Sequence, residues 1–174
     1  MITPWTEADR ETTLKAIGFA NRQIVIAWTE REPSREIPWT PLEKPLSACR
    51  VALVSTAALA LTGDEPFDQE GERRNPWWGD PSYRVLPRDT RTGDAVSWHM
   101  HIDTSVPERD LDSVMPLARL VELESEGFVG SSAPSHYSFM GYILKEKELL
   151  ERSTPAMIEQ MKREEVDAVL LVPV

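Results

Sequence analysis

The three histidines of the chain lie in two short stretches, SWHMHIDTS (97–105) and APSHYSFMG (133–141). If a strand ends in the first stretch, His99, His101 and Asp103 project from the same side, because side chains alternate along a strand. Two imidazoles and a carboxylate so placed can hold a divalent metal, and His136 on a later loop can complete the set. The same polar side chains can instead line a ligand pocket without a metal. The residue types and their spacing fit both interpretations.

A second string, GDPSYRVLPRDT (79–90), places an acid, a tyrosine and an arginine next to a glycine and a proline that shape the backbone. Tyr83 and Arg84 are suited to binding a substrate carboxylate, because a guanidinium can contact both carboxylate oxygens. Asp80 emerges from the same turn. The acids before it, between Asp64 and Glu70, are typical of a solvated surface. The chain contains no P-loop and no dinucleotide-binding glycine fingerprint.

Composition excludes several classes of partner. The 174 residues carry a formal net charge of −10, so the phosphates of nucleic acids and anionic membrane surfaces are not expected to bind. No apolar stretch reaches the roughly 20 residues of a membrane helix, and the first residues are acidic rather than basic. These features predict a cytoplasmic protein. The single cysteine, Cys49, rules out an internal disulfide and a cysteine metal cage, and we expect it to be buried.

The first part of the chain is expected to be an appendage. Apolar residues at helical spacing predict an amphipathic helix from Thr6 to Glu30. Four prolines between Pro33 and Pro45 then predict an extended strap, because each proline fixes φ and disfavours helix before it. We therefore assign residues 1–46 to an N-terminal helix and Pro-rich connector, and residues 47–174 to an α/β domain.

In residues 47–174, short apolar runs alternate with helical patterns. Strands are predicted at 49–61, 83–86, 95–100 and 166–174, and helices at 112–126, 144–152 and 154–165. Apolar strands separated by helices predict a mostly parallel sheet with helices on both faces, a Rossmann-like three-layer arrangement. Ligands bind such sheets at the C-terminal ends of the strands. We expect His99, His101 and His136 to converge there.

The last nine residues, VDAVLLVPV, read as an apolar strand that needs burial on both faces. The sequence predicts that Val169, Leu170, Leu171 and Val172 lie inside the sheet, and that Val174 emerges in the polar cleft near residues 99–103. If further elements normally cover this side, the chain should expose an apolar patch and self-associate as a homo-oligomer.

Five strings, taken together and in order, resemble one protein family: CRVALVSTAAL, GDPSYRVLPRDT, SWHMHIDTS with its following helix, SSAPSHYSFMGY and VDAVLLVPV. They are similar to the N-terminal portion of the glycine/sarcosine/betaine/D-proline reductase selenoprotein B family, from about residue 38 to residue 174. The resemblance implies reductive cleavage of a carbon–nitrogen bond α to a carboxylate. The substrate would be a small amino-acid-type molecule, and the nucleophile a selenocysteine or cysteine.

The resemblance also implies where the reacting groups lie. The nucleophile follows the strand that matches VDAVLLVPV, so selenocysteine or Cys is expected just beyond Val174, at a UGA codon that is read as a stop. The implied site has two parts: a catalytic group of His99, His101, Asp103 and His136, and a substrate-binding group of Asp80, Tyr83, Arg84 and Tyr137. His99 or His136 would protonate the departing amine.

Two other functions fit the same residues. One is a non-catalytic binding or assembly subunit whose last strand is completed by a partner, either a second copy or another reductase subunit. The other is a metal-dependent hydrolase in which His99, His101 and Asp103 hold the metal.

Overall fold

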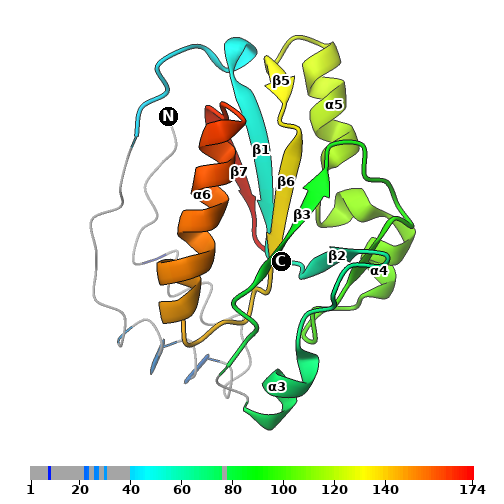
Figure 1. Ribbon diagram of the computed structural model, residues 1–174, viewed down its shortest axis with the longest axis vertical. Helices are drawn as coiled ribbons and strands as arrows, with labels where there is room; N and C mark the ends of the chain where they lie inside the picture. The colour runs from blue at the N-terminus through cyan, green and yellow to red at the C-terminus, as the bar shows by residue number, and fades with distance from the viewer. Residues whose placement is uncertain (1–7, 9–21, 24–25, 28–29, 31–39, 76–77) are drawn as a thin grey trace. The chain divides into compact units, whose positions relative to one another are not determined.

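The computed structural model describes residues 8, 22–23, 26–27, 30, 40–75 and 78–174 (Figure 1). The chain divides into a unit Met1–Pro41 and a unit Leu42–Val174. The residues described before position 31 are helical. The rest of the predicted N-terminal helix, together with Pro33 and Pro38 of the strap, lies outside the described residues. Pro45 directly precedes a 3-10 turn, η1 (Leu46–Ala48).

The second unit is built around one central strand, β1 (Arg50–Ser55). Strands β5 (Ser131–Ser132) and β6 (Ser135–Phe139) pair with β1 in parallel on one side, and β7 (Ala168–Val172) pairs in parallel on the other (Figure 1). Strand β3 (Tyr83–Pro87) runs antiparallel to β6. The sheet therefore has β7 at one edge and β3 at the other.

The α/β class is confirmed, but the sheet is mixed and the Rossmann-like three-layer arrangement is not confirmed. The predicted strand 49–61 is divided into β1 and β2 (Leu59–Leu61), because the chain turns at Ala58, whose φ is 50°. Strand β2 pairs antiparallel with β4 (Ala95–Ser97) in a separate ladder. An apolar pattern predicts that a strand is buried but does not encode its direction, so β3 could not be oriented from sequence.

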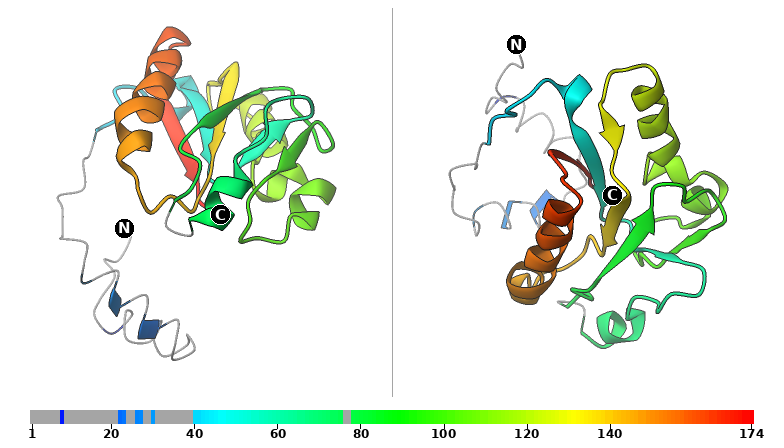
Figure 2. Two further views of the ribbon diagram at one scale, coloured as in Figure 1. Left: turned by 60° about the horizontal axis from the view of Figure 1, so that its bottom comes forward. Right: turned by 45° about the horizontal axis from the view of Figure 1, so that its top comes forward.

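Two longer helices cover the sheet from opposite faces (Figure 2). Helix α5 (Leu117–Ser125) packs Leu117 and Leu120 into the cluster that contains Leu53 and Leu86. Helix α6 (Thr154–Arg163) has a proline in its first turn and follows a π-helical turn, η3 (Leu149–Ser153). Its Met157 packs into the other cluster. Apolar burial on both faces stabilises the sheet by about 25 cal/mol per Å².

Three short elements lie in the connections: α3 (Gln69–Arg74), α4 (Ser105–Arg109) and η2 (Leu111–Ser113). Helix α3 replaces part of the loop expected between β2 and β3. Its start is stabilised by Asp68, whose Oδ1 accepts a hydrogen bond from the Gly71 N–H at 2.8 Å. Within the described part of the chain, no helix has the length and apolar content needed to span a membrane.

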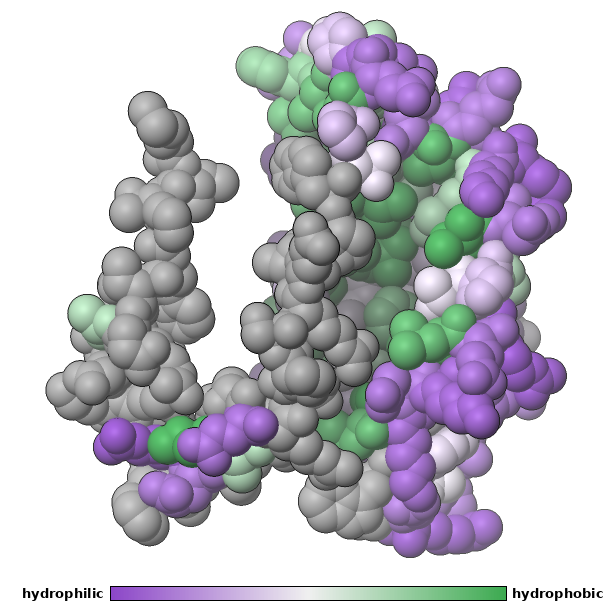
Figure 3. Space-filling view, turned by 90° about the vertical axis from the view of Figure 1, so that its left-hand side faces the viewer, coloured by the Kyte–Doolittle hydropathy of each residue, from purple (hydrophilic) through white to green (hydrophobic). Residues whose placement is uncertain are grey.

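Strand β7 forms as predicted at the end of the chain, but it is not buried as predicted. It pairs with β1 over its whole length, from Ala168 to Val172. The predicted burial is wrong, however, because Val169, Leu170 and Leu171 are 42%, 51% and 68% exposed. Within the described residues β7 has a neighbouring strand on one side only. Figure 3 shows hydrophobic residues at the surface on the side of the molecule where β7 forms the sheet edge.

Candidate functional site

Two of the three histidines lie together, in the turn that follows β4. Because β4 ends at Ser97, His99 and His101 are not on one face of a strand. Their rings meet edge to face, with centroids 5.8 Å apart. The His101 ring also packs on the ring of Tyr142 at 4.5 Å. Its Nε2 lies 2.7 Å from Oε1 of Glu72, on helix α3.

Glu72 is a site residue that the sequence did not reveal. It is only 3% exposed, although the other charged residues of α3, Glu70, Arg73 and Arg74, are exposed. Its Oε2, like Nε2 of His99, is buried without a hydrogen-bond partner among the described residues. Buried polar atoms are nearly always paired, so two unpaired atoms in one cluster make it a candidate site for a ligand, a reacting group or an ordered water.

The hydrogen bonds around His99 define its tautomer. The His101 N–H donates to His99 Nδ1 at 3.1 Å, so the ring proton of neutral His99 lies on Nε2. Burial, followed by the neighbouring His101, lowers the pKa of His99, although Glu72 partly opposes this. His99 is therefore a neutral hydrogen-bond donor near pH 7, and it is not suited to act as an imidazolium acid.

This cluster lies where three parallel strands end. Thr56 directly follows β1, and its Oγ1 accepts a hydrogen bond from the Val174 N–H, beyond β7, at 2.8 Å. Gly141 follows β6, and a Cβ at this position would lie 2.9 Å from His99 Nε2 and 3.1 Å from the Thr56 carbonyl oxygen. The lack of a side chain at Gly141 thus lets His99 approach the ends of the strands.

His136 is placed elsewhere, inside the sheet, so the three histidines do not converge. Pro134 separates β5 from β6, and the imidazole fills part of this break. Its Nδ1 accepts a hydrogen bond from the Leu53 N–H at 2.9 Å, so its Nε2–H donates to Ser132 Oγ at 3.0 Å. Both ring nitrogens are occupied by the fold, and neither is available to protonate a substrate.

Asp103 is also separate from the pair. It is exposed, and its Oδ1 accepts a hydrogen bond from the Ser105 N–H at 3.1 Å, at the start of α4. Hydrogen bonds from Ser105 lower the pKa of its carboxyl group. In the part of the chain that the structure describes, no three His, Cys, Asp or Glu side chains are grouped to hold a metal ion. Metal binding by His99 and His101 stays a prediction, which elemental analysis of the purified protein can test.

The predicted carboxylate-binding arginine is held by the backbone. Arg84 donates to the carbonyl oxygens of Glu65 at 2.7 Å and Pro66 at 3.0 Å, and its guanidinium lies 4.4 Å from the centre of the Phe67 ring. Its other terminal nitrogen donates to Ser82 Oγ and to the Tyr83 carbonyl. These contacts fasten the loop before α3 to strand β3.

The other residues of the predicted substrate-binding group lie around β3. Asp80 is buried and accepts hydrogen bonds from the N–H groups of Asp68 and Ser82. Together with Tyr83 it lines a surface hollow of about 600 Å³ that also contains Trp78 and Arg152. Tyr137 does not line this hollow, and its ring centre lies 6.1 Å from that of Tyr83. Burial, followed by Glu164, raises the pKa of the Tyr137 phenol far above its usual value.

Replacing Arg84 with lysine tests this structural role. Lysine keeps the charge but cannot contact several carbonyl groups at once. We expect the free energy of unfolding to fall by about 1–2 kcal/mol. Arg88→Lys is a matched control, because Arg88 makes one exposed ion pair, with Glu124, and should change stability by less than about 1 kcal/mol. Equal losses in denaturant titrations of the two variants would contradict the role assigned to Arg84.

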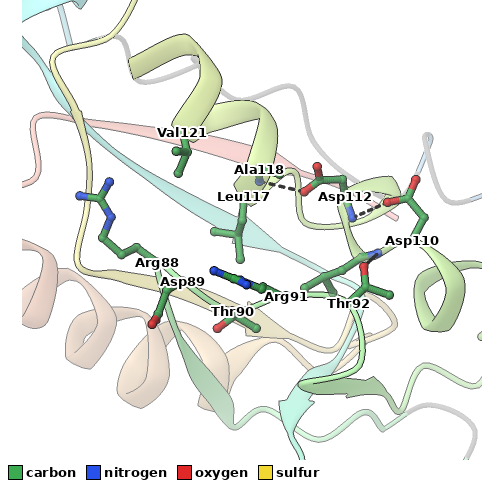
Figure 4. Close-up of a pocket in the computed structure, with 11 residues that line it drawn as sticks. Arg88, Asp89, Thr90, Arg91, Thr92, Asp110, Asp112, Leu117, Ala118 and Val121 are labelled. Carbon is green, nitrogen blue, oxygen red and sulfur yellow. Dashed lines mark hydrogen bonds between the residues drawn. The ribbon is translucent and has the colours of Figure 1, made fainter. Parts of the chain in front are cut away.

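A further hollow, of about 580 Å³, lies between the β3–β4 connection and the start of α5 (Figure 4). Arg91 extends into it. Two of its acids support the local backbone: Asp110 Oδ1 accepts from the Asp112 N–H, and Asp112 Oδ1 accepts from the Ala118 N–H. The hollow is beside the end of β3 that pairs with the start of β6. It is therefore at the opposite end of the sheet from His99, and none of the predicted site residues lines it.

The fold and the site define an α/β protein with a histidine–glutamate cluster at the ends of its parallel strands. The chain belongs to the glycine/sarcosine/betaine reductase selenoprotein B family, whose model matches residues 32–174. It is also 34% identical over 133 residues to the D-proline reductase subunit gamma of Acetoanaerobium sticklandii, across 76% of this chain and 52% of the relative. The chain thus spans about half the length of this curated relative. No solved structure matches it.

Proposed function

We propose that the chain is a component of a selenoprotein-B-like reductase that cleaves the carbon–nitrogen bond of a small amino-acid-type substrate. Family membership supports the reductase class. The substrates named in the family and in the relative are glycine, sarcosine, betaine and D-proline, each with a nitrogen on the carbon next to a carboxylate. The relative is a subunit by name, which supports assembly with other reductase subunits.

The observation that carries the proposal is that the end of β7 lies near the histidine cluster. Val174 is hydrogen-bonded to Thr56, and a Cβ at Gly141 would lie 2.9 Å from His99 Nε2 and 3.1 Å from the Thr56 carbonyl oxygen. A selenol or thiol in the residue that follows Val174 would supply the nucleophile at this point. Nε2–H of His99 and Oε2 of Glu72 have no hydrogen-bond partner in the described part of the chain, and both fit a site next to such a group.

The residues of the cluster have distinct roles in this proposal. Reductive cleavage of a primary or secondary amine breaks the carbon–nitrogen bond, and the carbon gains two electrons and a proton while the nitrogen leaves with another proton. The electrons come from a selenol or thiol pair that is oxidised to a selenenyl sulfide or disulfide. His99 donates a hydrogen bond from Nε2 to a substrate oxygen. His101, half exposed and held by Glu72 through Nε2, transfers the proton to the departing nitrogen through Nδ1.

Substitution of His101 tests this assignment in the full gene product assembled with its partner subunits. His101→Gln should lower kcat about 100-fold with glycine, sarcosine or D-proline as substrate and a dithiol as electron donor. The loss should be smaller with betaine, because its quaternary nitrogen leaves as a neutral tertiary amine and takes no proton. Glu72→Gln should alter the dependence of kcat on pH, because Glu72 orients His101. His136→Asn is the control and should keep kcat near neutral pH. Equal activity of wild-type and His101→Gln enzyme would rule out the proton-transfer role.

The nucleotide sequence after the Val174 codon provides a test that needs no assay. An in-frame UGA followed by coding sequence for a helix supports the reductase proposal. A UAA or UAG codon at this position would instead favour the non-catalytic assembly subunit.

A further inference from the structure

Helix α3 contacts the histidine turn at two positions. Besides the contact of Glu72 with His101, Gln69 donates a hydrogen bond from Nε2 to the Trp98 carbonyl oxygen at 2.8 Å. Gln69 and Glu72 are three residues apart, so they lie on the same face of the helix. The residues that they contact, Trp98 and His101, are also three apart. One face of α3 therefore holds both ends of the segment 98–101.

Two contacts define the orientation of the Gln69 amide. Arg73 donates from Nη2 to Gln69 Oε1 at 3.3 Å, and the Trp98 carbonyl oxygen can only accept. The NH2 group of Gln69 is therefore directed to Trp98. A glutamate at this position could not donate to a carbonyl group. In α3, whose sequence is QEGERR, Gln69 is the side chain that carries such a donor without a charge.

The backbone before His99 is held from both sides. The Trp98 N–H donates to the carbonyl oxygen of Ala58, shortly after β1, at 2.9 Å. Gln69 binds the carbonyl oxygen of the same residue. This carbonyl and the His99 N–H belong to one planar peptide group. Gln69 thus helps to fix the direction in which the His99 side chain leaves the backbone.

Helix α3 is itself fixed by the chain around Asp80. The carboxylate of Asp80 is buried and accepts a hydrogen bond from the N–H of Asp68, the residue before α3, at 2.9 Å. Trp78 lies close to the backbone of α3, since a Cβ at Gly71 would be 2.5 Å from its Cζ3 atom. A helix of six residues is not stable by itself. These tertiary contacts therefore determine where Gln69 lies.

We propose that Gln69 is a positioning residue of the candidate site and that it acts through His99. Its hydrogen bond to Trp98 fixes the His99 ring so that Nε2–H is directed to the substrate oxygen. This consequence rests on the proposed function, which assigns that oxygen to His99. Glu72 acts on the other histidine, His101. Two residues one helical turn apart thus have separate tasks: Gln69 supports substrate binding and Glu72 supports proton transfer.

Steady-state kinetics test the effect on substrate binding, in the full gene product assembled with its partner subunits. Gln69→Glu and Gln69→Leu both lack the donor. Each should raise KM about tenfold, because the hydrogen bond from His99 is misdirected, and should change kcat by less than about threefold. Glu70→Gln is the matched control, since Glu70 is the next residue of α3 and is exposed, where it pairs with Arg73 and Arg74. This variant should keep the wild-type KM.

Nitrogen NMR of isotope-labelled histidine gives a test that needs no turnover. Wild-type His99 should show a protonated Nε2 and an unprotonated Nδ1 near pH 7, because the His101 N–H donates to Nδ1. In Gln69→Glu and Gln69→Leu the ring should populate both tautomers, so the two signals should move towards each other. Glu70→Gln should keep the wild-type signals.

Circular dichroism confirms that each variant is folded before it is compared. Wild-type KM and wild-type His99 signals in both Gln69 variants would overturn the proposal, and so would a raised KM without a change in these signals. An effect of Gln69→Glu that Gln69→Leu lacks would also overturn it, because the added charge would then be the cause. If the wild-type enzyme reduced none of the substrates, the proposed function would fail, and the His99 signals would still decide the positioning role.

Discussion

Lowering the pH from about 7 to about 4 is expected to remove about 3 kcal/mol of unfolding free energy through His136 alone. The side chain is completely buried between Leu53 and Ser132. Burial, followed by the charge of Arg88, lowers its pKa from 6.5 to about 4. The unfolded chain therefore binds the proton first. The stabilisation is complete above about pH 6.5 and is lost as the pH falls through about 4.

Denaturant titrations at several pH values measure this loss, with His136→Asn as the comparison. Asparagine can still accept the Leu53 N–H through Oδ1, but it does not titrate. Carboxyl groups titrate in both proteins, so the difference between their stability curves isolates the histidine. His136→Leu leaves the Leu53 N–H unpaired and should cost a further 1–3 kcal/mol or so at neutral pH. Parallel curves for wild type and His136→Asn would show that the imidazole binds protons normally in the folded state.

Gly79→Ala is expected to lower the free energy of unfolding by about 3 kcal/mol and to move Tyr142 away from His101. A Cβ at Gly79 would lie 2.1 Å from the Tyr142 carbonyl oxygen and 3.0 Å from its carbonyl carbon. Both are backbone atoms and cannot rotate away. Because the Tyr142 ring packs on His101, the displacement would reach the candidate site.

Denaturant unfolding gives the stability of this variant, and the NMR signals of the His101 ring report whether Tyr142 still packs on it. Gly93→Ala serves as the control. A Cβ there has no atom within 4 Å, but φ is +96°, so this substitution introduces backbone strain of about 1 kcal/mol without a clash. If both variants lost the same stability and kept the same His101 signals, the close approach at Gly79 would be ruled out.

Local sequence patterns predicted much of the secondary structure but not how the strands combine. Thr154 and Pro155 marked the start of α6, and the apolar run after Cys49 marked β1, as the structure confirms. The burial of β7 was wrong for a physical reason. An apolar run indicates that a strand has the composition for burial, whereas its position in the sheet determines whether anything covers it.

The candidate site was only partly visible in the sequence. His99 and His101 stood out because histidines are few, but His136 looked equally reactive and serves the fold instead. The break in the ladder between β5 and β6 leaves the Leu53 N–H to the His136 ring, and the sequence contains no signal for the position of this break. Glu72 lies among charges that are typical of a solvated surface. Its burial depends on His101, which is 29 residues further along the chain.

The central position of β1 has a consequence for how the protein folds as it is synthesised. Leu53 is 83 residues from His136, and Thr56 is 118 residues from Val174. The strands that pair with β1 on its two sides, β6 and β7, therefore leave the ribosome long after β1 itself. Until then the apolar segment Val51–Val54 has no strand partner. Closing loops of this length costs entropy before any pairing is gained, so folding should be slow and governed by topology. During this interval the nascent chain is most exposed to aggregation, and binding by a chaperone would help it most.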